Sequence, residues 1–270
     1  EGVSSAASVV YKRQPYILPN ARFVYRMGAG EMVDIMHRDG FLCPLGGGLM
    51  GEMTDDLARE MGISRDAQDR FALESHQKAE TAFNEGKFEA EVATVEVPGR
   101  KGQTQPFRDE EIFRAEMNQE SLEKLKPVFR KDGTITAGNA CALCDAASAQ
   151  LLMDREIARQ QELEPMALIR GYAFVGYEPS RFGLSPVKAI PEALQKAGLQ
   201  LADIDLIELN EAFAAQYLAC EQKLDLDRDK VNVHGGAIAL GHPIAATGSK
   251  ILTTLLYALR QRDLQLGLVS

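Results

Sequence analysis

The stretch IDLIELNEAFAAQYLAC, residues 204–220, joins a strand pattern to a helix pattern with a polar residue between them. Residues 204–209 alternate in polarity and contain β-branched side chains, which is typical of a strand. Asn210 follows this strand, and residues 211–220 have the pattern of a helix. The stretch therefore predicts a strand-to-helix unit of an α/β sheet, with Asn210 at the strand end where such sheets bind ligands.

A second stretch with the same organisation follows after a short spacer. Residues 231–233 predict a short strand, the sequence GGAIALGHP spans residues 235–243, and a helix is expected over about residues 246–257. His242 is therefore expected at the end of a strand that neighbours the strand before Asn210.

The residue types of the two stretches suit acyl transfer. A histidine such as His242 can move a proton or donate a hydrogen bond near neutral pH. The glycines around it let backbone approach a ligand closely, and the N-terminus of the following helix offers free N–H groups to negative charge. Asn210 can fix a water or donate to an oxyanion. Together these features favour an active site over a glycine-rich turn with a structural histidine.

Both stretches resemble those of the thiolase family, the CoA-dependent acyltransferases that make or cleave 3-ketoacyl-CoA. Residues 49–51 and 63–69 resemble the family's loop-domain signature, and residues 133–140 resemble the stretch that re-enters the sheet. Residues 182–187 resemble the start of the C-terminal half. The resemblance implies an α/β protein with the layered thiolase-like fold, here partial, and with an inserted α/β loop domain.

The resemblance also implies a division of the chain into four parts. Residues 1–9 are expected to be a remnant of the N-terminal domain, residues 10–138 the CoA-binding loop domain, residues 139–164 the last elements of the N-terminal domain, and residues 165–270 a C-terminal domain truncated at its end. The order of strand and helix patterns after residue 138 predicts a mixed sheet layered with helices.

Local signals predict further elements along the chain. Ser64 and Gly86 bound a helix whose apolar positions recur every four residues. Ser185 is expected to cap a second helix, which ends at Gly198. Strands are expected at residues 91–97 and 166–173, and a buried strand or helix at residues 146–153.

The resemblance assigns roles to individual residues of the intact enzyme. His242 is expected to activate the nucleophilic cysteine and to help form an oxyanion hole, Asn210 to position a water at a second oxyanion site, and Gly241 to let backbone reach the thioester. CoA is expected as a substrate, with no metal and no other cofactor. The residues expected to contact substrate or CoA are Met50, Arg114, Phe129, Cys141, Phe182, Ala212 and Phe213.

Thiolases use two reactive cysteines, and the resemblance places both outside this sequence. The nucleophile lies upstream of the stretch that residues 1–5 resemble, and the acid/base cysteine lies in a C-x-G-G-G motif beyond residues 267–270. No second cysteine pair or nearby histidine completes a zinc site around Cys141 and Cys144. The chain is therefore expected to belong to a thiolase-type acyltransferase but to be inactive by itself. Buried, inert thiols are expected at Cys43, Cys141, Cys144 and Cys220.

Composition narrows the class of protein and its surroundings. The chain has 270 residues and a formal net charge of −9, which disfavours nonspecific nucleic-acid binding. No apolar run approaches the ~20 residues of a membrane span. Four cysteines and the absence of a signal peptide pattern suggest a reducing compartment, so a cytoplasmic location is expected, with organelle targeting left open. CoA or acyl-CoA is the expected partner, in a homodimer or homotetramer.

Two alternatives stand beside an active thiolase. The first is a thiolase-like protein that binds acyl-CoA or lipid without turnover, which the missing cysteines favour. The second is a nucleotide-binding oxidoreductase, which is disfavoured because no Gly-x-Gly-x-x-Gly turn follows a first strand. A chain of these residues alone is also expected to expose apolar surface and sheet edges, and therefore to associate. Structural or surface roles are expected for His37, His76 and His234.

Overall fold

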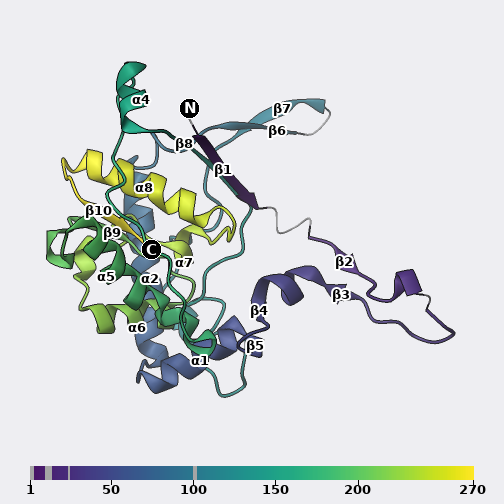
Figure 1. Cartoon of the computed structure of the whole chain (residues 1–270). Helices are drawn as coiled ribbons and strands as arrows, with labels where there is room; N and C mark the ends of the chain where they lie inside the picture. Colours follow the sequence, from purple (N-terminus) through teal and green to yellow (C-terminus); the bar gives the residue numbers. More distant parts are fainter. Residues whose placement is uncertain (1–2, 10–13, 24, 100–101) are drawn as a thin grey trace.

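The chain is described by a computed structural model that covers residues 3–9, 14–23, 25–99 and 102–270. Figure 1 shows helices packed together in one body, with the strand pairs β2–β3 and β6–β7 extending away from it. The strands are β1 (Val3–Val9), β2 (Tyr16–Ile17), β3 (Val33–Asp34), β4 (Leu42–Cys43), β5 (Gly48–Leu49), β6 (Val95–Pro98), β7 (Thr104–Phe107), β8 (Ala146–Leu152), β9 (Leu206–Glu208) and β10 (Gly267–Val269). The α-helices are α1 (Met50–Glu60), α2 (Arg65–Asn84), α3 (Gln119–Glu123), α4 (Arg155–Gln160), α5 (Ser185–Ala197), α6 (Ala214–Leu224), α7 (Ala237–Leu240) and α8 (Thr247–Gln261). Single turns of 3-10 or π helix span Ala21–Phe23, Met36–Phe41, Pro179–Leu184, Leu201–Asp203 and Arg228–Lys230.

The described strands pair two by two. β9 and β10 are parallel, with Leu206 beside Gly267, whereas β1 and β8 are antiparallel, with Val3 opposite Leu152. The pairs β2–β3, β4–β5 and β6–β7 are antiparallel as well. The predicted mixed sheet is not found in the described part of the chain, where each sheet is a two-stranded pair that is either parallel or antiparallel.

The largest hydrophobic core surrounds β9 and α6. Helix α6 lies against α1, α2 and α5, and the rings of Phe71 and Tyr217 stack with their centroids 4.1 Å apart. On another side of β9, Leu255 and Leu259 of α8 pack against Leu206. Burial of each such side chain contributes roughly 1.5–3 kcal/mol to folding. This core fixes the end of β9, where Asn210 follows.

Helix α2 begins and ends as the sequence predicts. The hydroxyl of Ser64 accepts a hydrogen bond from the backbone N–H of Ala67, at 3.1 Å, and so caps the first turn. Phe71 and Ala79 are buried on its inner face. Past its end, Gly86 has a φ of +66°, a conformation that glycine adopts without strain. The predicted helix is therefore confirmed.

The predicted strand at residues 231–233 is reduced to a single bridge. Val231 pairs with Ile207 of β9, but Asn232 has a φ of +47°, which takes the backbone out of strand geometry. The side chain of Asn232 continues the pairing in place of the backbone. Its Oδ1 accepts from the N–H of Leu209 at 2.9 Å, and its Nδ2 donates to the carbonyl of Leu209 at 2.8 Å.

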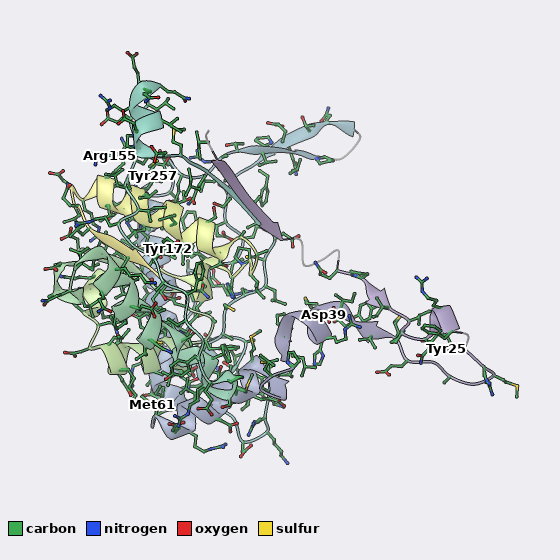
Figure 2. The ribbon with its side chains drawn as sticks, in the orientation of Figure 1. Tyr25, Asp39, Met61, Arg155, Tyr172 and Tyr257 are labelled. Atoms are coloured by element: carbon green, nitrogen blue, oxygen red, sulfur yellow. The ribbon has the colours of Figure 1, made fainter. Side chains whose placement is uncertain are left out.

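The predicted strand at residues 166–173 is wrong. This segment contains no strand, because a strand requires a hydrogen-bonded neighbour and none of the described residues pairs with it. The segment exposes large apolar side chains; Ile169 is 66% and Phe174 is 88% exposed. Figure 2 shows Tyr172, from the same segment, on the helical body.

Other predicted elements are found with changed limits. The edge strand predicted from residue 91 starts at Val95. Residues 146–152 form a strand, but it is not the predicted buried one: three of its seven side chains are exposed and the other four are half-buried. Ser185 is the first residue of α5 rather than its cap, and its hydroxyl donates to the carbonyl of Phe182 at 2.7 Å. Gly198 ends α5 with a φ of +69°, as predicted.

The predicted division into four parts stays a prediction. Residues 1–2 and 10–13, which lie at its first boundaries, are outside the described residues. Residues 14–23 and 25–34 extend from the body in Figure 1, and Figure 2 shows Tyr25 on this extension, far from Met61 and Tyr257 of the body. Within the described ranges, no helix is long and apolar enough to cross a membrane.

Candidate active site

Asn210 comes directly after β9 and presents an open hydrogen-bond acceptor. Its backbone N–H donates to the carbonyl of Ser270 at 3.0 Å, which holds the residue at the strand end. Its side-chain oxygen is buried, and no group in the described part of the chain donates to it. A buried amide oxygen without a partner costs stability, so such an atom is a candidate for holding a water or a ligand.

The turn after α7 places His242 at the predicted location. Gly241 precedes it with a φ of +76°, and a side chain at this position would overlap the sulfur of Cys144. The position therefore requires glycine. The backbone N–H of His242 donates to the carbonyl of Ala142 at 3.0 Å, so the turn is fixed on a second element. Helix α8 follows at Thr247, which confirms the predicted helix.

The His242 ring is half-buried and uncharged at neutral pH. Its Nδ1 lies 2.7 Å from the hydroxyl oxygen of Thr247. Burial, with the positive charge of Lys250, lowers the pKa of His242 to about 4. The ammonium of Lys250 donates to the carbonyls of Leu240 and Gly241, at 2.7 and 3.1 Å. A neutral imidazole of this kind can accept a proton.

Residues 139–142 connect the Asn210 segment to the His242 turn. The N–H of Cys141 donates to the carbonyl of Ala212 at 3.1 Å, and the N–H of Ala214 donates to the carbonyl of Asn139 at 2.9 Å. The carbonyl of Ala142 holds His242, as described above. The two stretches that the sequence singles out are therefore bound to the same short segment.

A buried carboxyl group links the same regions and was not predicted. Glu211 accepts from the hydroxyl of Ser75 at 2.7 Å, from Nδ2 of Asn232 at 2.8 Å and from the N–H of Ile238 at 3.2 Å. The N–H of Gly236 in turn donates to Ser75 at 3.0 Å. Burial raises the pKa of Glu211, while these hydrogen bonds act in the opposite direction. The one signal in the sequence is that Glu211 directly follows Asn210.

Three predicted contact residues lie together beside this network. The rings of Phe129 and Phe213 meet edge to face with centroids 5.9 Å apart. Phe129 also covers Gly51, where any side chain would overlap its ring, and Gly51 directly follows Met50 at the start of α1. Phe213 itself bridges to Ala140. The structure therefore joins Met50, Phe129 and Phe213 to the segment that holds His242.

Two further predicted contact residues, Phe182 and Arg114, are described by their burial and by their neighbours. Phe182 is half-buried in the turn before α5, and its neighbour Gly183 packs against Gln216 of α6. Arg114 is exposed, and its backbone N–H donates to Nδ1 of the buried His76 at 3.1 Å. A contact between Arg114 and CoA stays a prediction.

Cys141, Cys144 and Cys220 are poor nucleophiles, although only Cys220 is buried as predicted, and Cys43, Cys141 and Cys144 are half-buried. Burial raises the pKa of Cys141 to about 12 and that of Cys144 to about 11. Cys220 is fully buried in the core, and its pKa is raised to about 12 for the same reason. A thiol with such a pKa is almost entirely protonated at neutral pH and does not attack a thioester efficiently.

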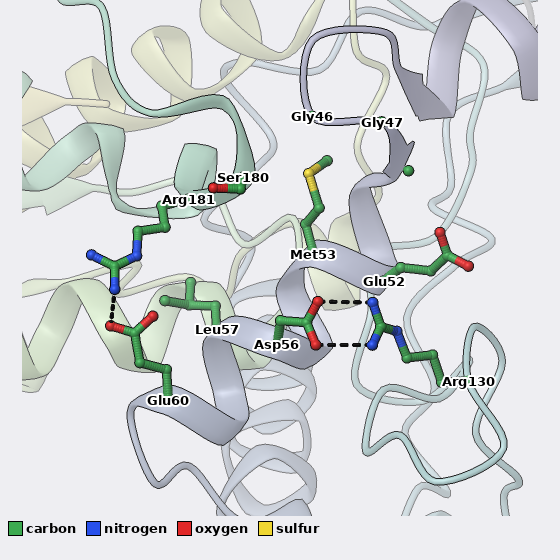
Figure 3. A pocket seen from close by; sticks show the side chains of 11 residues that line it. Gly46, Gly47, Glu52, Met53, Asp56, Leu57, Glu60, Arg130, Ser180 and Arg181 are labelled. Atoms are coloured by element: carbon green, nitrogen blue, oxygen red, sulfur yellow. Dashed lines mark hydrogen bonds and ion pairs between the residues drawn. The ribbon is translucent and has the colours of Figure 1, made fainter.

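A cavity of about 340 Å³ lies between α1 and the turn before α5 (Figure 3). Its two arginines are already paired: Arg130 with Asp56, at 2.9 and 2.8 Å, and Arg181 with Glu60. None of the ten predicted site residues lines it. Within the described ranges, no group of three or more His, Cys, Asp or Glu residues could hold a metal ion.

Comparison with known families decides the classification. Residues 12–156 match the thiolase N-terminal domain, and residues 163–270 match the thiolase C-terminal domain. The chain belongs to the thiolase family. The predicted family and the layered α/β fold class are confirmed.

Individual thiolases show how far the similarity extends. The chain is 49% identical to the acetyl-CoA acetyltransferase of Escherichia coli (strain K12) over 257 residues, which are 95% of this chain and 65% of that protein. Its sequence is 40% identical to that of the Bacillus anthracis acetyl-CoA acetyltransferase. The crystal structure of that protein matches this chain with a TM-score of 0.95, and the match covers 100% of this chain and 68% of that one. The human mitochondrial 3-ketoacyl-CoA thiolase gives 40% identity and a TM-score of 0.92 over 97% of this chain and 66% of that one. The chain therefore spans 65% of the length of the Escherichia coli relative.

Proposed function

We propose that this chain supplies the histidine and asparagine of a thiolase active site, in a protein that condenses acyl-CoA or cleaves 3-ketoacyl-CoA by thiolysis. The observation that carries the proposal is the shared anchoring of Asn210 and His242. Asn210 presents a buried oxygen with no partner among the described residues, His242 presents a neutral imidazole, and residues 139–142 bind both of their segments. The names of the relatives, acetyl-CoA acetyltransferase and 3-ketoacyl-CoA thiolase, support the reaction class.

In the proposed thiolysis, a cysteine thiolate attacks the 3-keto carbon of the substrate. His242 takes the proton of this thiol, the bond between C2 and C3 breaks, and a second thiol protonates the departing acetyl-CoA enolate. Asn210 holds a water that donates to the enolate oxygen. The thiol of CoA then attacks the acyl-cysteine and releases the shortened acyl-CoA. Both reactive thiols are proposed to come from segments outside residues 1–270.

The proposal also covers the use of CoA, the residues that contact it, the oligomeric state and the location of the protein. CoA acts as a substrate, and no metal or other cofactor takes part. The contact residues Met50, Phe129 and Phe213 are proposed to lie along its pantetheine arm. A homodimer or homotetramer and a cytoplasmic location stay predictions from the resemblance and the composition.

A second function is favoured by one observation. The pKa values of Cys141, Cys144 and Cys220 are all raised, so none of these thiols is prepared for attack. If Cys43 does not act as the nucleophile either, residues 1–270 alone would bind acyl-CoA without turnover. Binding and turnover are therefore measured separately in the test of the proposal.

The test uses a chimera in which residues 1–270 are flanked by the terminal segments of the Escherichia coli relative. We expect this protein to cleave acetoacetyl-CoA with free CoA. His242→Ala should lower kcat by about 10²- to 10⁴-fold and change KM much less, because a positioned general base acts on the transition state. The rate of thioester loss at saturating substrate gives kcat.

The exposed His37 provides a matched control for this substitution. His37→Ala should leave kcat unchanged within about twofold, because a substitution distant from the site rarely perturbs it. Equal kcat values for the parent chimera and its His242→Ala variant would contradict the assigned role of His242.

A further inference from the structure

The neutral ring of His242 carries one proton, on either Nδ1 or Nε2. Its Nδ1 lies 2.7 Å from Oγ1 of Thr247. A hydroxyl can donate to an imidazole nitrogen or accept from it, so this contact alone fits both tautomers. The proton of the Thr247 hydroxyl therefore decides between them.

The hydroxyl of Thr247 has a second contact that uses this proton. Its Oγ1 lies 3.0 Å from the carbonyl oxygen of Pro243, four residues earlier. A carbonyl only accepts, so the single hydroxyl proton is donated there, as threonines commonly do in a helix. The backbone N–H groups of Ala246 and Thr247 donate to the same oxygen, at 2.7 and 2.9 Å. Oγ1 is left with lone pairs for His242.

We propose that Thr247 is a positioning residue that fixes the tautomer of His242, with the proton on Nδ1 and the unshared electron pair on Nε2. Its importance for turnover rests on the proposed thiolase function. The tautomer itself follows from the hydrogen bonds of Thr247 and does not depend on the reaction.

The backbone around His242 is held independently of Thr247. The ammonium of Lys250 binds the carbonyls of Leu240 and Gly241 on one side of the turn. The N–H of His242 itself is bound by the carbonyl of Ala142. A change at Thr247 should therefore alter the ring of His242 while leaving the turn in place.

The assigned tautomer suits the proton transfer in the proposed reaction. As the S–H bond of the nucleophilic cysteine breaks, its proton moves to the electron pair on Nε2 and a thiolate forms. The resulting imidazolium keeps its Nδ1–H bond to Thr247. A ring that already carried its proton on Nε2 could not accept a second proton at that atom.

The test is solid-state 15N NMR of the 270-residue chain labelled only in its histidine rings, at pH 7. The sequence contains four histidines, and a His242→Gln variant identifies the resonances of His242 by their loss. We expect a protonated Nδ1 and an unprotonated Nε2. Thr247→Ser, which keeps the hydroxyl, should give the same spectrum, whereas Thr247→Val should lose the protonated Nδ1 as the major signal.

Two results would overturn the assignment. One is a protonated Nε2 in the parent chain, a result that does not depend on whether any variant folds. The other is an unchanged His242 spectrum in Thr247→Val. A merely structural role would not produce a change of tautomer that serine reverses.

Kinetics of the chimera separate this inference from the proposed function. Thr247→Val should lower kcat by about tenfold or more with little change in KM, and Thr247→Ser should restore it. If the parent chimera shows no turnover, the proposed function fails, while the NMR spectra still decide the tautomer. If turnover is present and the spectra contradict the assignment, the inference on Thr247 fails alone.

Discussion

At the scale of residues, two asparagines close to β9 have opposite surroundings. The side chain of Asn232 makes three hydrogen bonds, to the N–H and carbonyl of Leu209 and to the carboxyl of Glu211. The side-chain oxygen of Asn210 is buried and unpaired within the described part of the chain. An unpaired buried group lowers stability, which is consistent with the proposed role of Asn210 in holding a water.

Alanine substitutions at these two positions should separate stability from activity. Asn210→Ala should change the free energy of unfolding by less than about 1 kcal/mol, because no hydrogen bond within the protein is lost. In the chimera it should lower kcat by about 10²-fold, as expected when an oxyanion contact is removed. Asn232→Ala should destabilise the protein by about 2–4 kcal/mol, because it leaves buried partners unpaired.

Urea unfolding and thiolysis of acetoacetyl-CoA check this pair of variants. A loss of stability at Asn210 as large as that at Asn232 would show that Asn210 is structural.

The sequence predicts the location of the two proposed catalytic residues better than that of the residues around them. Asn210 and His242 were found because each follows a predicted strand and carries a reactive or polar side chain. Ser75 and Glu211 are 136 residues apart in the chain, so their hydrogen bond depends on tertiary packing that no local pattern contains. Local signals report backbone conformation, whereas buried polar networks follow from the fold.

At the scale of elements, Glu91 connects the region after α2 to α8. Its carboxyl accepts from the hydroxyl of Thr254 at 3.1 Å. Burial raises the pKa of Glu91 to about 7, although this hydrogen bond and the positive charge of Lys250 act in the opposite direction. The folded state therefore binds the proton of Glu91 more tightly than the unfolded state, where its pKa is near 4.3.

This difference predicts a pH-dependent effect of Glu91→Gln. The stability that comes from protonated Glu91 is fully present below about pH 4 and is lost as the pH rises to about 7. Glutamine does not titrate, so the variant should gain about 1–3 kcal/mol relative to the parent between pH 5 and pH 8. Urea unfolding at both pH values and a fixed protein concentration measures this gain.

The exposed Glu89 gives the matched control. Glu89→Gln should show the same difference from the parent at both pH values. A Glu91→Gln effect that is independent of pH would contradict the raised pKa.

Helix ends with strong local signals were predicted correctly, whereas the predicted strands were found only in part: residues 204–209 contain β9, but residues 166–173 form no strand. Ser64 with Gly86, and Gly198 after α5, set helix ends through hydrogen bonds and φ angles that are local in sequence. The predicted strand at residues 166–173 failed because strand formation depends on a partner. At Asn232 the backbone leaves strand geometry and a side chain takes over the pairing, which alternation of residue types does not reveal.

At the scale of the whole molecule, the segment at residues 166–174 leaves an apolar surface uncovered. Leu168, Ile169, Tyr172 and Phe174 are all exposed, and the rings of Tyr172 and Phe174 lie 5.8 Å apart. Contiguous apolar patches on a protein surface commonly mark contacts with other chains. This agrees with the expectation from the sequence that a chain of these residues associates.

We expect residues 1–270, prepared as such, to self-associate with rising concentration. Replacing Tyr172 and Phe174 by serine should weaken this association about tenfold or more, because two large apolar side chains leave the contact. Sedimentation velocity across a concentration series measures it. Leu45→Ser, at another exposed apolar residue, should have a smaller effect, and a monomeric parent at all concentrations would contradict the prediction.

This chain is proposed to carry the histidine and asparagine of a thiolase site, while Cys141, Cys144 and Cys220 do not react. The most direct measurement is thiolysis of acetoacetyl-CoA by residues 1–270, with CoA binding followed in parallel. We predict measurable CoA binding and no turnover above background, for the parent and for Cys141→Ser and Cys144→Ser. Turnover by the parent that either serine substitution abolishes would show that one of these cysteines is the nucleophile, and would contradict the account.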